Sequence, residues 1–195
     1  MLSLAHLVGL AYVAWPNKTR RHFTASSPYL REGNMPSTDA ITPAFISPDG
    51  LREHWQGHRR LTRRAIEAFP EDKLFDFSLG GMRTFGEMAK EMLGMAVPTI
   101  DGLITDNWGG YEAAKVTTRS ELLSGWDEAT QDIDARWPKI PVPHFQDTVT
   151  AFGQWTMPAH ALLLYLVDNE IHHRGQGYVY LRALGIEPPP FYERT

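Results

Sequence analysis

Apolar residues recur every three or four positions in four stretches of the chain, which is the period of a helix with one buried face. The first stretch follows Ser47-Pro48-Asp49, where a serine N-cap precedes a proline and an acidic residue suited to a helix start. It ends at Pro70. The pattern predicts a helix between these points, whose buried face consists of Leu51, Trp55, His58, Thr62, Ala65 and Phe69.

Two further helices are predicted from capping boxes, in which a threonine and a glutamate three residues later satisfy each other's backbone N–H groups. One box spans residues 84–87 and the other spans residues 118–121. We expect Pro98 to end or kink the first of these helices near residues 100–103, and Pro138 to end the second. The apolar face of the second consists of Leu122, Trp126, Ala129, Ile133 and Trp137.

The last helix is predicted to start near Thr156, with Pro158 in its first turn, and to end at Leu184 with Gly185 beyond it. Polar residues interrupt the face that should be buried, which is unusual because a helix normally keeps such groups on its solvent side. That face consists of Leu162, Leu166, Asn169, His173, Gln176, Tyr180 and Leu184.

The chain shows no convincing strand pattern. Residues 145–155 are predicted to be mostly loop with a short extended piece, and a loop of this length suggests a role in covering the mouth of a cavity. We therefore predict an all-α fold for residues 47–195, an antiparallel four-helix bundle with a long loop before the last helix.

Residues 1–46 are predicted to be an N-terminal extension, because residues 16–46 show no sustained period. The apolar stretch Leu2–Trp15 lacks the preceding basic residues of a secretory signal. Arg31–Met35 can be encoded by a purine-rich run ahead of an ATG codon, as in a bacterial ribosome-binding site. Two interpretations stay open: a translated upstream region before a native start at Met35, or a genuine, poorly structured extension.

The composition excludes several kinds of site. Without cysteine, the chain has no disulfide, thiolate metal site or cysteine nucleophile. The formal net charge of −4 argues against a general nucleic-acid binder, and no apolar run has the length of a membrane span. We interpret the basic cluster Arg59, Arg60, Arg63 and Arg64 as a solvated face, with nucleic-acid association as the minority hypothesis. We expect a cytoplasmic protein.

Glu91 and His173 are the strongest candidates for a chemical role. Glu91 lies among methionines on an apolar stripe, so its carboxylate must be protonated, paired with a cation such as arginine, or metal-bound. Asn169 and His173 share one helical face, and Glu170 stands in a Glu-x-x-His spacing with His173. If the two helices are neighbours, Glu91, Asn169 and His173 would form a three-ligand metal set, with Glu170 as the alternate ligand and open positions for water or substrate.

The last predicted helix resembles the final helix of the DinB/YfiT family. The match runs over Glu170-Ile171-His172-His173-Arg174-Gly175-Gln176 and continues through Tyr180–Ile186 into prolines, and residues 84–94 resemble the family's second helix. The likeness covers roughly residues 47–192. It implies a four-helix bundle, usually a homodimer, with a divalent metal held by three histidines. One of these comes from the second helix and two from a His-x-x-x-His pair in the last. Members with assigned activity include thiol-dependent transferases, hydrolases and isomerases.

The sequence departs from the family pattern at two of the three ligands. Glu91 stands at the position of the helix-two histidine and Asn169 at that of the first histidine of the pair, so only His173 matches. One hypothesis is a retuned site for one divalent ion (Zn, Ni, Mn or Fe), since oxygen-rich sites favour the harder ions. Such a site implies a metal-dependent transferase or hydrolase for a small molecule or a low-molecular-weight thiol.

The alternative hypothesis is a site without metal. Glu91 and His173 would then pair with each other, and the chain would be a non-catalytic, stress-related binding protein. Under either hypothesis His58, Gln176 and Tyr180 are candidates for the substrate pocket, because they lie on the buried faces of the first and last helices.

Overall fold

The computed structural model describes residues 45–110 and 112–195. These residues belong to the unit Pro43–Thr195, and residues 1–44 and 111 lie outside the described residues. The predicted N-terminal extension therefore falls almost wholly outside the described part of the chain, and the start at Met35 stays a prediction.

Four long helices make up most of the described residues, and the first three start at the predicted capping signals. The four helices are α1 (Pro48–Ala68), α3 (Phe85–Thr105), α4 (Arg119–Arg136) and α5 (Ala159–Ala183). The Ser47 hydroxyl accepts from the Gly50 N–H at 3.0 Å, and Thr118 forms the full capping box. Short helical pieces lie between them: α2 (Glu71–Leu74), η1 (Trp137–Lys139) and η2 (Val142–Gln146).

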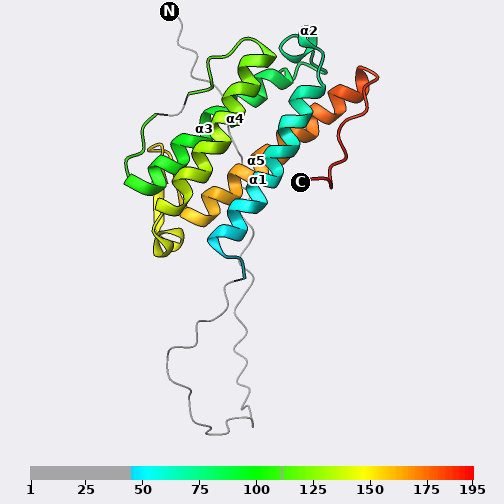
Figure 1. Ribbon diagram of the computed structural model, residues 1–195. Helices are drawn as coiled ribbons and strands as arrows, with labels where there is room; N and C mark the ends of the chain where they lie inside the picture. The colour runs from blue at the N-terminus through cyan, green and yellow to red at the C-terminus, as the bar shows by residue number, and fades with distance from the viewer. Residues whose placement is uncertain (1–44, 111) are drawn as a thin grey trace, which may run out of the picture. The chain divides into compact units, whose positions relative to one another are not determined.

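The long helices pack around a shared interior, where α1 and α3 each contact both α4 and α5 (Figure 1). The core has two apolar clusters. One contains Leu51, Trp55, Leu162, Leu163, Leu166 and Val167, and the other contains Ile66, Phe69 and Tyr180. Between them along α1 and α5 lie buried polar residues: His58, Arg59, Thr62, Glu170, His173 and Arg174. Buried charges need partners. The residues of this polar layer accordingly form hydrogen bonds with one another and with α4.

The all-α prediction is wrong before the last helix, where a two-stranded antiparallel hairpin pairs β1 (Thr148–Ala151) with β2 (Trp155–Pro158). The turn uses two left-handed residues, Phe152 (φ 53°) and Gly153 (φ 67°). The alternation within β1 is only four residues long, which is too short to stand out from a loop. Consequently α5 starts at Ala159 rather than near Thr156. Pro158 occupies the N-cap position just before the helix instead of its first turn.

Pro98 does not end α3, which continues to Thr105 and stops at Asp106 in the left-handed conformation (φ 54°). The predicted end of α5 is correct to within one residue, since Gly185 adopts φ 76° and the Ile186 N–H donates to the Leu181 carbonyl. No helix among the described residues is long and apolar enough to cross a membrane.

Two glycines on α5 provide a matched test of helix packing. A Cβ added at Gly177 would lie 2.5 Å from the ring of Phe85, whereas one at Gly175 would meet nothing within 4 Å. We expect Gly177→Ala to lower the free energy of unfolding by about 1–3 kcal/mol through overpacking. Gly175→Ala should raise it by up to about 1 kcal/mol through helix propensity. Urea denaturation measures both, and an equal effect of the two variants would contradict this packing.

Candidate functional site

Two of the predicted site residues meet across the interface between α3 and α5. The Glu91 Oε1 atom lies 3.2 Å from the Nε2 atom of His173. The Glu91 side chain is 22% exposed and that of His173 is 8% exposed, so the contact lies at the edge of the interior. The sequence pattern predicted this meeting, because each residue lies on the inward stripe of its own helix.

Arg83 is the third member of the site, and sequence reasoning missed it. It comes from the segment before α3, and its Nη1 atom donates to the Oε2 atom of Glu91. Its Nη2 atom lies 3.5 Å from the Nε2 atom of His173. The Tyr180 hydroxyl donates to the Arg83 carbonyl at 3.0 Å and thereby fixes this segment against α5. No periodic pattern marks Arg83; the only available signal was the need of Glu91 for a cation.

The electrostatics of the site favour an ionised Glu91. Burial alone would raise the pKa of this carboxyl, but hydrogen bonds with His173 and Arg83 outweigh burial and lower the pKa to about 2. Arg83 is the exposed partner, because 51% of its side chain is accessible. A ligand arriving from solvent would therefore meet a guanidinium first, with the carboxylate and imidazole behind it.

Asn169 and Glu170 do not join this cluster. The Asn169 amide nitrogen lies 3.9 Å from the Sδ atom of Met95. Glu170 points toward α1, where its Oε1 atom accepts from the Thr62 hydroxyl at 2.6 Å and lies 3.8 Å from Arg174. Glu170 lies three positions before His173, so the two side chains point about 60° apart around the helix axis. Glu170 therefore belongs to the buried polar layer.

A small cavity lies beside the buried polar layer. Asn169, Glu170 and Arg59 contribute its polar lining, together with Trp55 and two methionines. The space open to the centre of a water molecule is about 10 Å³, which is room for roughly one water. This cavity is too small for a small-molecule ligand.

The three residues predicted to line a pocket have different surroundings. His58 is buried on the opposite side of α5, between Arg174 and Arg194. The Gln176 amide turns outward and lies 2.7 Å from the exposed His172 ring. Tyr180 is fully buried and supports Arg83 through its hydroxyl. Only Tyr180 thus touches the site, and it acts through the backbone of Arg83.

Whether a divalent metal fits this site depends on which atoms face the space between Glu91 and His173. Glu91 and His173 face each other as two ligands would, but the Asn169 amide faces a sulfur and the Arg83 guanidinium lies beside both ligands. A metal-binding histidine also normally donates its second ring N–H to a carboxylate or carbonyl. The Nδ1 atom of His173 is buried without a partner. The residues in this arrangement fit a guanidinium, not a divalent cation.

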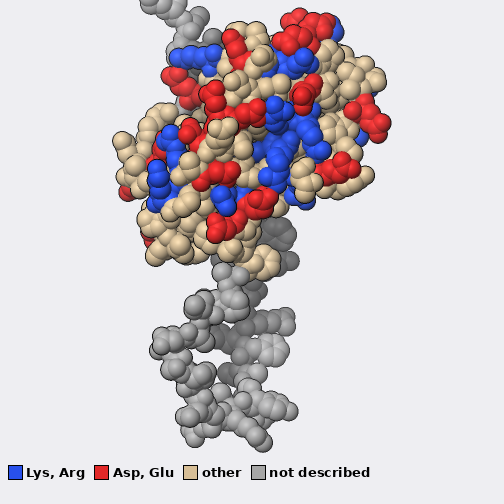
Figure 2. All heavy atoms as spheres, in the orientation of Figure 1, with Lys and Arg blue, Asp and Glu red and all other residues tan. Residues whose placement is uncertain are grey.

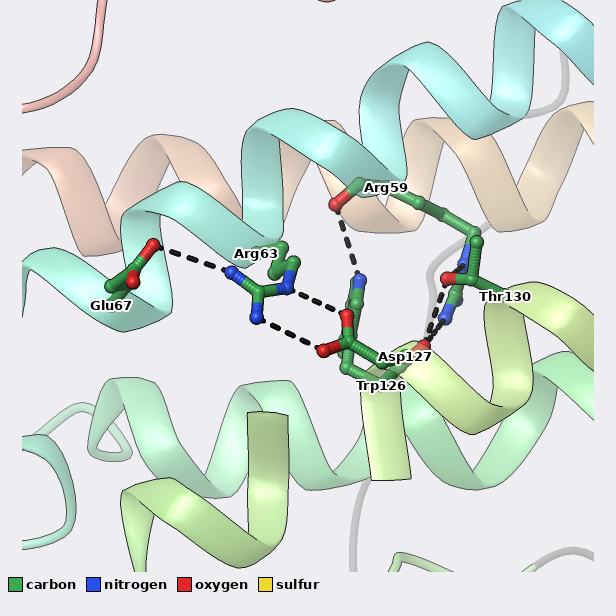
Figure 3. A network of polar contacts seen from close by, with 6 residues as sticks. All are labelled: Arg59, Arg63, Glu67, Trp126, Asp127 and Thr130. Atoms are coloured by element: carbon green, nitrogen blue, oxygen red, sulfur yellow. Dashed lines mark hydrogen bonds and ion pairs between the residues drawn. The ribbon is translucent and has the colours of Figure 1, made fainter. Parts of the chain in front are cut away.

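The arginines of the basic cluster on α1 form hydrogen bonds and ion pairs with other groups of the same chain. Arg59 is buried, where it donates to the Trp126 carbonyl at 3.0 Å and lies over the Trp126 ring. Arg63 forms a two-pronged pair with Asp127 (Figure 3). The surface over α1 shows a group of Lys and Arg side chains bordered by Asp and Glu (Figure 2). Arg59 and Arg63 thus join α1 to α4, whereas Arg60 and Arg64 donate to the backbone carbonyls of Arg194 and Glu193.

The fold and its sequence identify a protein family. The family model described as "DinB family" matches residues 45–195, and the chain belongs to this family. It is 24% identical over 144 residues to "Uncharacterized protein YjoA" of Bacillus subtilis (strain 168), covering 72% of this chain and 93% of that protein.

Two solved structures share the fold. A DinB-like protein from Bacillus cereus ATCC 10987 superimposes with a TM-score of 0.60 at 18% identity, covering 76% of this chain and all of that one. The DinB-like protein YjoA from B. subtilis gives a TM-score of 0.59 at 20% identity, covering 74% and 99% of the two chains. At these identities the likeness concerns the fold alone.

Proposed function

We propose that this DinB-family protein binds a small anionic molecule without a metal, through the cluster of Arg83, Glu91 and His173. One observation carries the proposal: the Arg83 guanidinium is bonded to the carboxylate that faces His173. A cation is thus already present at the point where two ligand-type side chains converge. Its positive charge compensates Glu91, and its exposed side can pair with a carboxylate or thiolate of the bound molecule.

The molecule's anionic group would be held mainly by Arg83, because Glu91 repels anions and His173 is almost wholly buried. Mercaptoacetate is a suitable probe, since it carries a carboxylate and a thiol on two carbons. We expect saturable binding by the wild-type protein, measured by calorimetry, and loss of that binding in Arg83→Ala. Equal binding by both proteins, or none by the wild type, would overturn the assignment.

A metal-dependent transferase or hydrolase is the second candidate. It is supported by the approach of Glu91 Oε1 to His173 Nε2, which come from two different helices. Metal would require Arg83 to move out and Asn169 to turn toward the pair. Zn, Ni, Mn and Fe are the ions that this donor set would accept, with the oxygen of Glu91 favouring the harder ones.

Zinc binding by Arg83→Ala tests whether the guanidinium occupies the place of a metal. If the guanidinium takes the place of a metal, its removal frees Glu91 and His173, and we expect zinc affinity to rise at least about tenfold. Lys90→Ala is the matched control, because Lys90 is a neighbouring cation that pairs with Glu87 instead. Calorimetric titration with zinc measures both variants. A gain in Lys90→Ala as large as that in Arg83→Ala would show a general charge effect and contradict the proposal.

A further inference from the structure

A separate cluster of hydrogen-bond donors lies on the other side of α5, where the C-terminal segment crosses α1 (Figure 1). The Nε atom of Arg60 donates to the Arg194 carbonyl at 2.8 Å, and Arg64 donates to the Glu193 carbonyl. Gly57 allows this close approach, because a Cβ there would lie 3.3 Å from that of Arg194. The Arg194 side chain is thereby held above His58.

The His58 ring lies between two guanidinium groups. The Nη2 atom of Arg174 lies 2.9 Å from its Nδ1, and the Nη1 atom of Arg194 lies 2.9 Å from its Nε2. Burial, followed by the charges of Arg174 and Arg194, lowers the pKa of His58 to about 3, so the ring is neutral at pH 7. A neutral imidazole accepts at one nitrogen only and carries N–H on the other, while guanidinium offers only donors. In one of the two arginine contacts, the N–H of the His58 ring therefore faces an N–H of a guanidinium.

Two more donors nearby lack an acceptor. The Tyr178 hydroxyl and the Nε atom of Arg64 are both buried and have no hydrogen-bond partner among the residues that the structure describes. Burial raises the pKa of Tyr178, and the positive charges of Arg174, Arg64 and Arg182 oppose this, which places the phenol among these three arginines. Unsatisfied buried donors of this kind are costly unless something accepts from them.

The cluster also carries excess positive charge. Arg64 and Arg174 have carboxylates within 4 Å, Glu193 and Glu170 respectively. Among residues 45–110 and 112–195, Arg182 and Arg194 have no acidic partner at ion-pair distance. Two uncompensated guanidiniums call for about two negative charges, which is the charge of a phosphate group near neutral pH.

We propose that the donor cluster around His58, between α1 and α5, binds a phosphate-type dianion. Its oxygens would accept from His58 Nε2–H, the Arg194 guanidinium, the Tyr178 hydroxyl and Arg64 Nε, which converts each unmatched donor into a charge-assisted hydrogen bond. The site is independent of Arg83, since it lies on the face of α5 that contacts α1.

Calorimetry on the full chain at constant ionic strength tests this site. Inorganic phosphate and ethyl phosphate serve as probes of a free ion and a monoester, and acetate serves as the monoanion control. We expect saturable 1:1 binding of at least one phosphate probe, tighter than acetate. Arg194→Ala should weaken it at least about tenfold and Tyr178→Phe by a smaller factor.

Arg136→Ala is the matched control, because this arginine is similarly exposed but pairs with Asp101. It should bind phosphate as the wild type does. The proposal is overturned if neither phosphate probe binds, if acetate binds as tightly as phosphate, or if Arg194→Ala and Arg136→Ala have the same affinity. This test is distinct from that of the Glu91–His173 site, because it varies Arg194 and Tyr178 whereas the other varies Arg83.

Discussion

Arg59→Ala is expected to lower the free energy of unfolding by about 3–5 kcal/mol, as is typical when one member of a buried charged network is removed. Arg59 is 1% exposed, and its guanidinium lies 4.4 Å from the centre of the Trp126 ring. It donates to the Trp126 carbonyl and to the Thr130 hydroxyl (Figure 3). Its charge also opposes the effect of burial, which raises the pKa of Glu170. The alanine variant loses all these contacts and leaves a cavity.

Arg63→Ala is the matched control, one helical turn further along α1. Its pair with Asp127 has good geometry, at 2.6 and 2.9 Å, but 34% of its side chain is exposed. Solvent screening limits the expected loss to about 0.5–1 kcal/mol. Chemical denaturation of both variants gives the comparison. Similar losses would show that burial does not govern the strength of these arginine contacts.

Acidification should destabilise the wild-type protein already below pH 6.5, because His58 resists protonation only in the folded state. Its folded pKa of about 3 lies below the ordinary value of 6.5. Between these values the unfolded chain binds the additional proton, so stability is complete above pH 6.5 and falls as the pH drops toward 3. One group contributes at most about 1.4 kcal/mol per pH unit, or about 2 kcal/mol between pH 6.5 and 5.

Glu91 adds to this loss at lower pH. Its folded pKa of about 2 lies below the ordinary 4.5, so its contribution is present above pH 4.5 and is lost as the pH falls toward 2. His58→Gln should therefore flatten the stability profile between pH 6.5 and 5 while leaving the loss below pH 4.5. His172→Gln, which replaces an exposed histidine, should leave both parts unchanged. A wild-type profile that is flat from pH 6.5 to 5 would contradict the account of His58.

Local signals predicted the helices well because their causes are local. The hydroxyl groups of Ser47, Thr84 and Thr118 each accept from an N–H of the first turn, and each was readable from neighbouring residues. The hairpin was missed because its strands have four residues each and its turn uses Phe152 at positive φ. Pro98 was expected to end or kink α3, but the helix continues past it to Thr105.

The sequence predicted two members of the site, Glu91 and His173, but not the third, Arg83. Helical spacing placed Glu91 and His173 on inward stripes, and the packing of α3 on α5 then brought them together. Arg83 lies in an irregular segment, so its approach depends on the tertiary fold and on the Tyr180 hydroxyl. Asn169 shares a face with His173, yet its amide lies against Met95. Sequence spacing does not fix which neighbour a side chain contacts.

The metal content of the untagged wild-type protein tests the central claim most directly. Elemental analysis after purification, and again after incubation with zinc followed by dialysis, should find far less than one divalent ion per chain. Thermal unfolding should be the same with and without a chelator, because Arg83 already compensates Glu91. One tightly held ion per chain that disappears in His173→Ala would contradict the account and establish a metal site at Glu91 and His173.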